Sequence, residues 1–333
     1  MTMTSNSNLL TAKDLAVGYG KGKHALPVLS NIDIEVPPGE LICILGPNGV
    51  GKSTLLRTLA GVQKALAGEI WLGATPQSEM NRNEIAERIS LVLTDPLPPS
   101  QLTVEELVAL GRYPHTNWLG RLTDKDRKAV QQALDQTKLN QLANEPIYKL
   151  SDGQMQKVMI ARALAQEGAI MILDEPTSFL DINNQWSTMT LLQSVASQHN
   201  KAILVATHQL ELALQTADQL WIINRASNLV MGLPEDLALN GTINETFFDE
   251  DVAFDLSTGK FKFNTPEYEM VQVIGNGEAL YWTKAALKRN GYQPKDMAEK
   301  VITIKSDIKG TEWEMNGKMF KSIRELLAEL KGT

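Results

Sequence analysis

Residues 46–54 read Gly46-Pro47-Asn48-Gly49-Val50-Gly51-Lys52-Ser53-Thr54. Their spacing fits the pattern G-x-x-x-x-G-K-[ST] of a phosphate-binding loop. The preceding segment Leu41–Leu45 has the length and branching of a buried parallel strand, and the helix-forming residues Thr54–Ala60 follow the loop. Because a strand, a glycine loop and a helix form the context that such a loop requires, we predict that residues 46–54 bind phosphate groups.

The chemistry of this loop follows from its residue types. Glycines allow backbone N–H groups to face phosphate oxygens without a Cβ in the way, and the following helix adds partial positive charge at its N-terminus. Lys52 is expected to reach the terminal phosphates, and the Ser53 hydroxyl is expected to ligate Mg²⁺. The alternative, an ordinary glycine-rich turn between a strand and a helix, does not require the full spacing.

The composition is that of a soluble protein with a large core, since 43% of the 333 residues are apolar and 21% are charged. No apolar run approaches the roughly 18 residues that a membrane span needs. The polar segment Met1–Asn8 lacks the parts of a secretory signal. The single cysteine, Cys43, excludes an internal disulfide and fits a reducing cytoplasm. If this protein works at a membrane, it must dock on a partner that spans it.

The charge distribution predicts two domains. Residues 260–333 hold 13 basic and 10 acidic side chains, a net charge of +3, whereas residues 1–259 carry −10. The acidic larger part argues against a nucleic-acid-binding surface. Residues 236–259 have the composition of a loop-rich linker. We therefore predict a first domain over residues 1–235, a linker over 236–259 and a small α/β accessory domain over 260–333.

The order of patterns within residues 1–235 predicts an α/β fold with a parallel-sheet core. Short apolar segments with Gly and Pro punctuation in residues 10–45 indicate an antiparallel β subdomain, and residues 95–165 are mainly helical. Apolar strands then alternate with helices, as in βαβ units. In the last domain, Asn316-Gly317 is a type I′ hairpin signal between two short strands, and Ser322–Leu330 is an amphipathic helix.

Two further segments carry chemistry. The apolar strand Ala169–Leu173 ends in Asp174 and Glu175, so Asp174 is expected to hold Mg²⁺ and Glu175 to orient or deprotonate an attacking water. The alternative is a buried strand with acidic residues at its solvent end. The segment Leu150–Gln154 places a Ser and a Gly before a helix, which is typical of an anion site, and its alternative is a plain helix cap.

In this combination and order, the segments resemble the ATP-binding subunit of ABC transporters, over roughly residues 10–235. In that family two cassettes close head to tail around two ATP molecules. The resemblance implies that Tyr19 stacks on adenine and that His208 touches the γ-phosphate. A packing tyrosine and a capping histidine are the alternatives. The nucleotide-binding set that the resemblance implies is Tyr19, Gly46, Pro47, Asn48, Gly49, Gly51, Lys52, Ser53, Thr54, Ser151, Gly153, Gln154 and Asp181.

The resemblance also implies roles for residues inside and outside that set. Glu175, His208 and Lys52 are the expected catalytic residues. Ser151 and Gly153 of one copy would contact the γ-phosphate held by the Lys52 loop of a second copy, and Asp181 matches the loop that links the two sites. The expected Mg²⁺ ligands are Ser53, Asp174 and Thr94.

Two positions depart from the family pattern. Asp152 stands where the family's signature usually has Gly, and Thr94 stands where a glutamine normally ends the strand Ile89–Leu93. The neighbours Ser151 and Gly153 are intact, so the signature is expected to keep its role. Thr94 offers a hydroxyl for Mg²⁺ or its water but is shorter than Gln, so the residue that senses Mg²⁺ stays open at this stage.

The segment Thr103–His115 is similar to the equivalent stretch in importers of ferric siderophores, haem and cobalamin. In that subfamily this segment, with the loop after the strand Ile89–Leu93, receives the coupling helix of the permease. The alternative is a surface helix that ends at Gly111. The resemblance implies an ATP-hydrolysing importer subunit, a homodimer bound to the cytoplasmic face of the inner (cell) membrane, with a permease and indirectly a substrate-binding protein as partners. The alternative is a soluble ABC-type ATPase or an ATP-gated interaction module.

Residues 260–333 are not part of the usual importer ATPase. One hypothesis is a regulatory domain that binds a ligand or meets its twin across the dimer. The other is an appendage that stabilises the chain.

Overall fold

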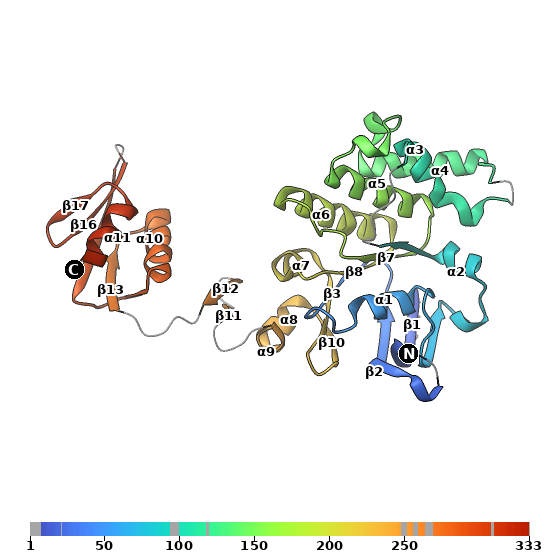
Figure 1. The fold of residues 1–333 in the computed structure, drawn as a ribbon, viewed down its shortest axis with the longest axis horizontal. Coiled ribbons are helices and arrows are strands. Elements are labelled where there is room, and N and C mark those ends of the chain that lie inside the picture. The colour runs from blue at the N-terminus through green and yellow to red at the C-terminus, as the bar shows by residue number, and fades with distance from the viewer. Residues whose placement is uncertain are drawn as a thin grey trace, which may run out of the picture. The chain divides into compact units, whose positions relative to one another are not determined.

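The computed structural model describes residues 8–20, 22–93, 100–117, 120–247, 252–255, 259–263, 269–307 and 310–332. The chain divides into two compact units (Figure 1). The first comprises Met1–Phe248 with Leu256–Lys260, and the second comprises Asp249–Asp255 with Phe261–Thr333.

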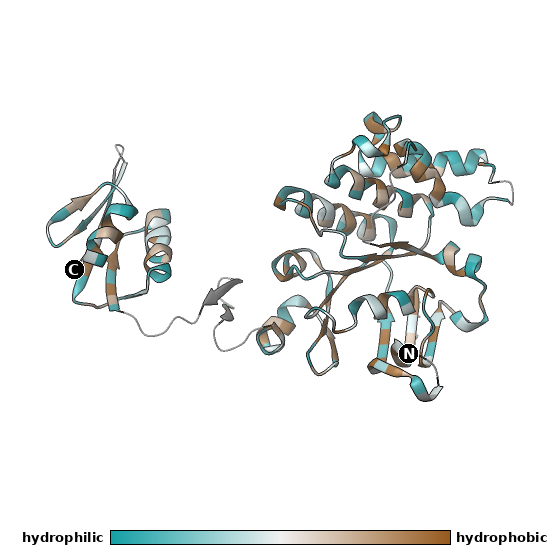
Figure 2. Cartoon of the chain, in the orientation of Figure 1, coloured by the Kyte–Doolittle hydropathy of each residue, from teal (hydrophilic) through white to brown (hydrophobic). Residues whose placement is uncertain are grey.

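The centre of the first unit is a six-stranded sheet with the order β10-β9-β3-β8-β7-β6. Every neighbouring pair is parallel except β9 and β10. Strands β3, β7 and β8 are buried along their whole lengths, which explains their near-continuous apolar sequences (Figure 2). The strands are β3 (Leu41–Leu45), β6 (Ile89–Val92), β7 (Ile170–Asp174), β8 (Ala202–Ala206), β9 (Gln219–Ile223) and β10 (Leu229–Gly232).

A second, antiparallel sheet has the order β2-β1-β4-β5. Helix α1 (Lys52–Leu59) follows the phosphate loop, and its residues Leu55, Leu56 and Leu59 belong to one buried cluster that includes side chains of both sheets. The start of α1 is therefore fixed by the packing of two sheets. The strands are β1 (Leu10–Tyr19), β2 (Leu26–Val36), β4 (Ala67–Leu72) and β5 (Thr75–Pro76).

Helices cover the central sheet and build a helical subdomain, drawn in green and yellow-green in Figure 1. Helix α6 packs on β3 and β8, whereas α3, α4 and α5 pack on one another. The helices are α2 (Arg82–Arg88), α3 (Val104–Ala109), α4 (Asp124–Thr137), α5 (Asp152–Ala165), α6 (Ile182–His199) and α7 (Leu210–Thr216). Short 3-10 turns are η1 (Gly22–His24), η2 (Gln77–Glu79), η3 (Leu110–His115), η4 (Asn140–Leu142) and η5 (Ile147–Lys149).

The structure differs from the expected linker over residues 236–259. Helices α8 (Pro234–Leu239) and α9 (Thr242–Phe247) occupy its first part and belong to the first unit. Pro234 suits the first turn of a helix, because its missing N–H has no partner there. The side chains of Leu237 and Ile243 are buried, so this segment contributes to the core of the first unit.

The second unit contains a five-stranded sheet with the order β14-β13-β15-β16-β17. Side chains of α10 and α11 share one buried cluster with alternate residues of the sheet, so both helices cover the same face. The indole N–H of Trp313 donates to Thr283 Oγ1 at 2.7 Å inside this core. The elements are β13 (Glu269–Ile274), α10 (Gly277–Arg289), β14 (Tyr292–Lys295), β15 (Lys300–Asp307), β16 (Gly310–Met315), β17 (Lys318–Phe320) and α11 (Ile323–Gly332). Upstream, β11 (Val252–Asp255) and β12 (Lys260–Phe263) pair with each other.

The predicted hairpin of the second unit is confirmed. Asn316 and Gly317 have φ of 51° and 79°, as both central residues of a type I′ turn require. The predicted helix is α11, and its Leu326 and Leu330 are buried.

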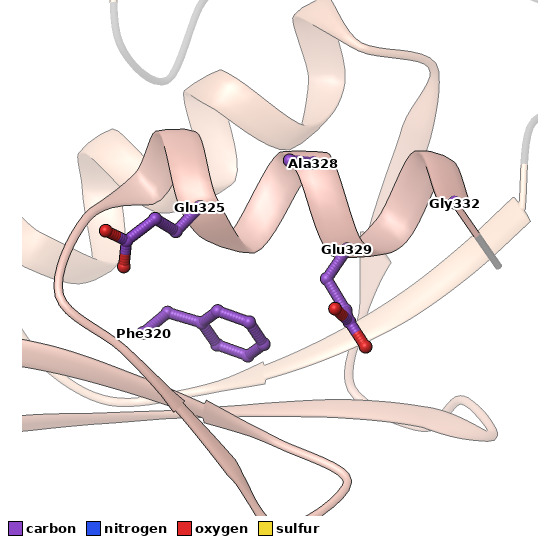
Figure 3. A pocket seen from close by; sticks show the side chains of 5 residues that line it. All are labelled: Phe320, Glu325, Ala328, Glu329 and Gly332. Atoms are coloured by element: carbon purple, nitrogen blue, oxygen red, sulfur yellow. The ribbon is translucent and has the colours of Figure 1, made fainter.

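A shallow pocket lies between α11 and Phe320 (Figure 3). Both carboxylates that line it have partners. Glu325 accepts from the backbone N–H of Lys321 at 2.8 Å, and Glu329 pairs with Lys318 at 2.6 Å. The pocket therefore offers no charged group that lacks a partner.

A buried ion pair holds the helical subdomain together. Arg112 of η3 is 1% exposed, and its Nε donates to Asp126 Oδ1 of α4 at 2.8 Å. The other carboxylate oxygen, Oδ2, accepts from the hydroxyl and the backbone N–H of Thr123. Hydrogen bonds from Thr123, and then the Arg112 charge, lower the pKa of Asp126 to about 2, against the opposing effect of burial.

We expect Asp126→Asn to lower the free energy of unfolding at pH 7 by about 3 kcal/mol, because it leaves Arg112 buried without its main counter-charge. Since the folded-state pKa of Asp126 is depressed, its stabilising effect is complete above about pH 4 and is lost as pH falls toward 2. Urea unfolding should show that Asp126→Asn loses less unfolding free energy, relative to the unmodified protein, at pH 2.5 than at pH 7. The exposed neighbour Asp124, changed to Asn, is the control, and an equal Asp126→Asn deficit at both pH values would contradict this account.

Candidate nucleotide-binding and hydrolysis site

The phosphate loop joins β3 to α1 through three glycines with positive φ. The φ angles of Gly46, Gly49 and Gly51 are 156°, 82° and 110°. A Cβ on Gly46 would lie 2.5 Å from the carbonyl oxygen of Ile223, and a Cβ on Gly51 would lie 2.5 Å from Val28 Cγ1. Two of the glycines are therefore required by packing as well as by backbone conformation.

Lys52 lies inside the loop that precedes it. It is 6% exposed, and its Nζ donates to the carbonyl oxygens of Gly46 at 2.7 Å and Pro47 at 3.1 Å. Burial lowers the pKa of Lys52, and the nearby Glu175 and Asp174 carboxylates oppose this shift. The ammonium group of Lys52 thus contacts the loop and interacts electrostatically with the two acidic residues Glu175 and Asp174.

Tyr19, at the end of β1, reaches the start of α1. Its hydroxyl lies 2.9 Å from Thr54 Oγ1, and the residue is 57% exposed. A packing tyrosine would be buried, whereas this side chain is accessible beside the phosphate loop. Its place supports the prediction that it stacks on a nucleotide base.

The acidic pair lies where parallel strands end side by side. Asp174 is the last residue of β7 and is buried, and the backbone N–H of Glu175 donates to Ala206 O of β8 at 2.9 Å. The side chain of Glu175 accepts a hydrogen bond from Ser178 Oγ at 2.8 Å, and its Oε2 lies 3.6 Å from His208 Nδ1. The pairing of β7 with β8 therefore brings His208 to Glu175.

The backbone at Glu175 is unusual. Its φ is 49°, a left-handed conformation that non-glycine residues rarely adopt. Such strain is common at functional sites, where surrounding structure holds a residue in place. Here the hydrogen bonds to Ala206 and Ser178 hold it.

The donor set beside the loop fits Mg²⁺. Ser53 offers a hydroxyl and Asp174 a carboxylate, and Mg²⁺ is typically bound by one or two carboxylates together with substrate phosphates and waters. Thr94, the third ligand predicted from sequence, lies outside the described residues.

The segment 150–154 forms a helix cap. Gln154 N–H donates to Ser151 Oγ at 3.3 Å, and Ser151 N–H donates to Gln154 Oε1 at 2.9 Å, which is a capping box at the start of α5. Asp152 is exposed in the first helical turn. The cap leaves the helix N-terminus accessible, so the capping and anion-binding interpretations are compatible.

Gly153 connects this cap to α6. A Cβ on Gly153 would lie 2.7 Å from Asn184 Cγ, and Asn184 donates through its backbone N–H and its Nδ2 to Asp181, both at 2.8 Å. Ser151, Gly153 and Asp181 therefore form one cluster, and Asn184 joins them.

The comparisons agree with this geometry. The family model "ABC transporter" matches residues 29–178, and "Iron ABC transporter C-terminal domain" matches residues 268–331. The ferric enterobactin transport ATP-binding protein FepC of Escherichia coli (strain K12) is 37% identical over 235 residues, which are 71% of this chain and 85% of FepC. This chain belongs to the ATP-binding proteins of ABC transporters.

Solved structures place the cassette in the same fold. An inward-facing structure of a putative metal-chelate type ABC transporter is similar with a TM-score of 0.62 and 28% identity, covering 72% of this chain and 89% of that one. A dimeric cassette in a post-hydrolysis state, bound to ADP and phosphate, has a TM-score of 0.55 and 26% identity, covering 64% and 93%. The predicted fold class is confirmed, and the cassette is an ATPase.

Sequence reasoning assigned no role to Ser178, Asn184 or Arg112. Ser178 and Asn184 hold Glu175 and Asp181 in place, and Arg112 is buried in the helical subdomain. Asn184 lies three residues after a capping Asp, a spacing that signals an exposed cap rather than contact with a distant glycine. The helix end expected at Gly111 placed Arg112 just beyond a helix but did not predict that its side chain is buried.

Among the helices that the structure describes, none is both long and apolar enough to cross a bilayer.

We expect Gly51→Ala to weaken ATP binding about tenfold or more, because the new Cβ meets Val28 and a left-handed backbone disfavours it. Gly73→Ala is the matched control, since Gly73 also has positive φ but no heavy atom within 4 Å of the added Cβ. Titration with a non-hydrolysable ATP analogue measures both variants. Equal affinities of the two would show that close packing at Gly51 does not shape the loop.

Proposed function

We propose that this cassette energises the uptake of a ferric siderophore, or a similar iron, haem or cobalamin chelate, through a membrane permease. The observation that carries the proposal is the union in one chain of an ATPase site with a second unit that matches the iron transporter C-terminal domain. The name of FepC, a ferric enterobactin transport protein, supports an iron chelate as the solute. This union favours transport over a soluble ATPase or interaction module.

Glu175 is the proposed general base. Its carboxylate accepts a proton from water as the water oxygen bonds to the γ-phosphorus and the bond to the bridging oxygen of ADP breaks. Ser178 fixes the orientation of this carboxylate, and His208 lies next to it. Lys52 neutralises charge that develops on the phosphate oxygens.

We propose Ser53 and Asp174 as the Mg²⁺ ligands in this site, with Thr94 as a further candidate. Bound Mg²⁺ would neutralise charge on the β- and γ-phosphate oxygens. The place of Asp174 favours this role, because it ends β7 at the same edge of the sheet as the phosphate loop.

The proposed active form is a head-to-tail homodimer. Ser151 and Gly153 at the N-terminus of α5 would cover the nucleotide held by the Lys52 loop of the second copy, since a helix N-terminus attracts anions. The dimeric state of a similar cassette supports a dimer as the active form. Asp181 shares a cluster with Gly153 and would carry the effect of one site to the other.

The proposed docking patch for the permease is formed by Leu110 and Tyr113 of η3, which are 53% and 75% exposed. Exposed apolar side chains on adjacent turns are typical of a protein interface. Docking there places the cassette on the cytoplasmic face of the cell membrane as a peripheral subunit. A substrate-binding protein would deliver the solute to the other side of the permease.

The test is Mg-ATP turnover with Glu175→Gln, measured with and without the permease of the same gene cluster. We expect at least a hundredfold loss of turnover, because a positioned base contributes about that factor. ATP-induced dimerisation should be enhanced, because the bound ATP is no longer hydrolysed. Glu235→Gln, an exposed carboxylate in α8, is the control. Absence of turnover in both conditions, together with a Glu175→Gln variant that dimerises like the unmodified protein, would refute the proposed function.

Uptake of a radiolabelled ferric siderophore into proteoliposomes tests the solute. Transport that depends on ATP and stops with Glu175→Gln is expected. ATP turnover without uptake of any iron, haem or cobalamin chelate would refute the solute class but not the ATPase.

A further inference from the structure

Arg112 connects three parts of the helical subdomain through one buried guanidinium. Its Nε donates to Asp126 of α4, and its Nη1 donates both to the carbonyl oxygen of Ala165 and to Glu167 Oε2, each at 2.7 Å. Ala165 is the last residue of α5, and Glu167 follows two positions later. Arg112 thus attaches η3 to the C-terminal end of α5.

His115 makes a second attachment at the same corner. Its Nε2 lies 2.8 Å from the carbonyl oxygen of Gln166. The backbone of η3 is also packed closely on α5, because a Cβ on Gly111 would lie only 2.1 Å from the carbonyl oxygen of Arg162. Side chains and backbone of the 110–115 segment therefore hold the end of α5 from several directions.

The same corner meets the central sheet. Gln166 Nε2 donates to the carbonyl oxygen of Ile89 in β6 at 2.8 Å and also to that of Ala86 in α2. A displacement of η3 would therefore act at the joint between the helical subdomain and the sheet.

The other end of α5 carries the cap at Ser151. Because α5 has 14 residues at about 1.5 Å per residue, its two ends are roughly 20 Å apart on one continuous helix. Leu110 and Tyr113, the docking patch, lie in the same six-residue η3 as Arg112 and His115. The docking patch and the nucleotide-covering end are thus attached to opposite ends of one rigid element.

We propose that Arg112, together with His115, is a positioning residue that transmits displacement of the docking patch to Ser151 through α5. The proposal rests on the proposed function, in which the permease docks at η3 and Ser151 covers nucleotide. Arginine suits this role because its planar fork makes several hydrogen bonds in fixed directions, which the single ammonium of lysine does not reproduce.

The first experiment uses Arg112→Lys and His115→Ala in the full chain, with Arg127→Lys on the exposed face of α4 as control. Without the permease, we expect the turnover and the KM for ATP of both variants to stay within twofold of those of the unmodified protein. Stimulation of turnover by the permease should fall at least fivefold in both variants. His115→Ala keeps the Arg112–Asp126 pair and serves as the test if Arg112→Lys fails to fold.

Two outcomes overturn the inference. In the first outcome, the permease binds both variants and stimulates their turnover to within twofold of its effect on the unmodified protein. This would show that Arg112 and His115 do not transmit displacement. An equal fall of basal and stimulated turnover would show a structural role only. If the permease does not bind the unmodified protein, the proposed function itself fails.

The second experiment needs no permease. Spin labels on Tyr113→Cys and Asp152→Cys, both exposed positions, report the distance between η3 and the cap of α5, since the native cysteine is buried. We expect one narrow distance distribution with Arg112 present and a distribution at least twice as wide with Arg112→Lys. Equal widths would contradict the rigid attachment.

Discussion

The site depends on the parallel pairing of β3, β8 and β7. Each of these strands is buried on both faces, and their carboxyl ends lie at one edge of the sheet. That edge holds the phosphate loop after β3, Asp174 at the end of β7 with Glu175 next to it, and His208 after β8. Since the strands cannot shift register without exposing apolar side chains, the hydrophobic core fixes the relative positions of the phosphate loop, the acidic pair and His208.

The groups that we propose to face the nucleotide fall into two clusters. One contains Lys52, Glu175 and His208, and the other contains Ser151, Gly153 and Asp181 with Asn184 between them. A head-to-tail dimer would combine the first cluster of one copy with the second cluster of the other. The buried contacts of Arg112 then give the second cluster a mechanical attachment to the surface where a permease is proposed to dock.

The second unit has its own hydrophobic core and its own sheet. The carboxylates of its pocket are already engaged, so the pocket offers no evident charge for a ligand. The match of this unit to an iron transporter domain supports an iron chelate as the transported solute. That the unit regulates or stabilises the cassette stays a hypothesis.

The sequence by itself determined the local features. The phosphate loop, the acidic pair, the helix cap at Ser151 and the Asn316-Gly317 hairpin are all set by neighbouring residues, because turn conformation and capping act over a few positions. The structure alone decided that Arg112 is buried and that Asn184 joins Gly153 to Asp181. It also decided that residues 234–247 form helices of the first unit. These depend on contacts between residues far apart in the chain, which only the packed core brings together.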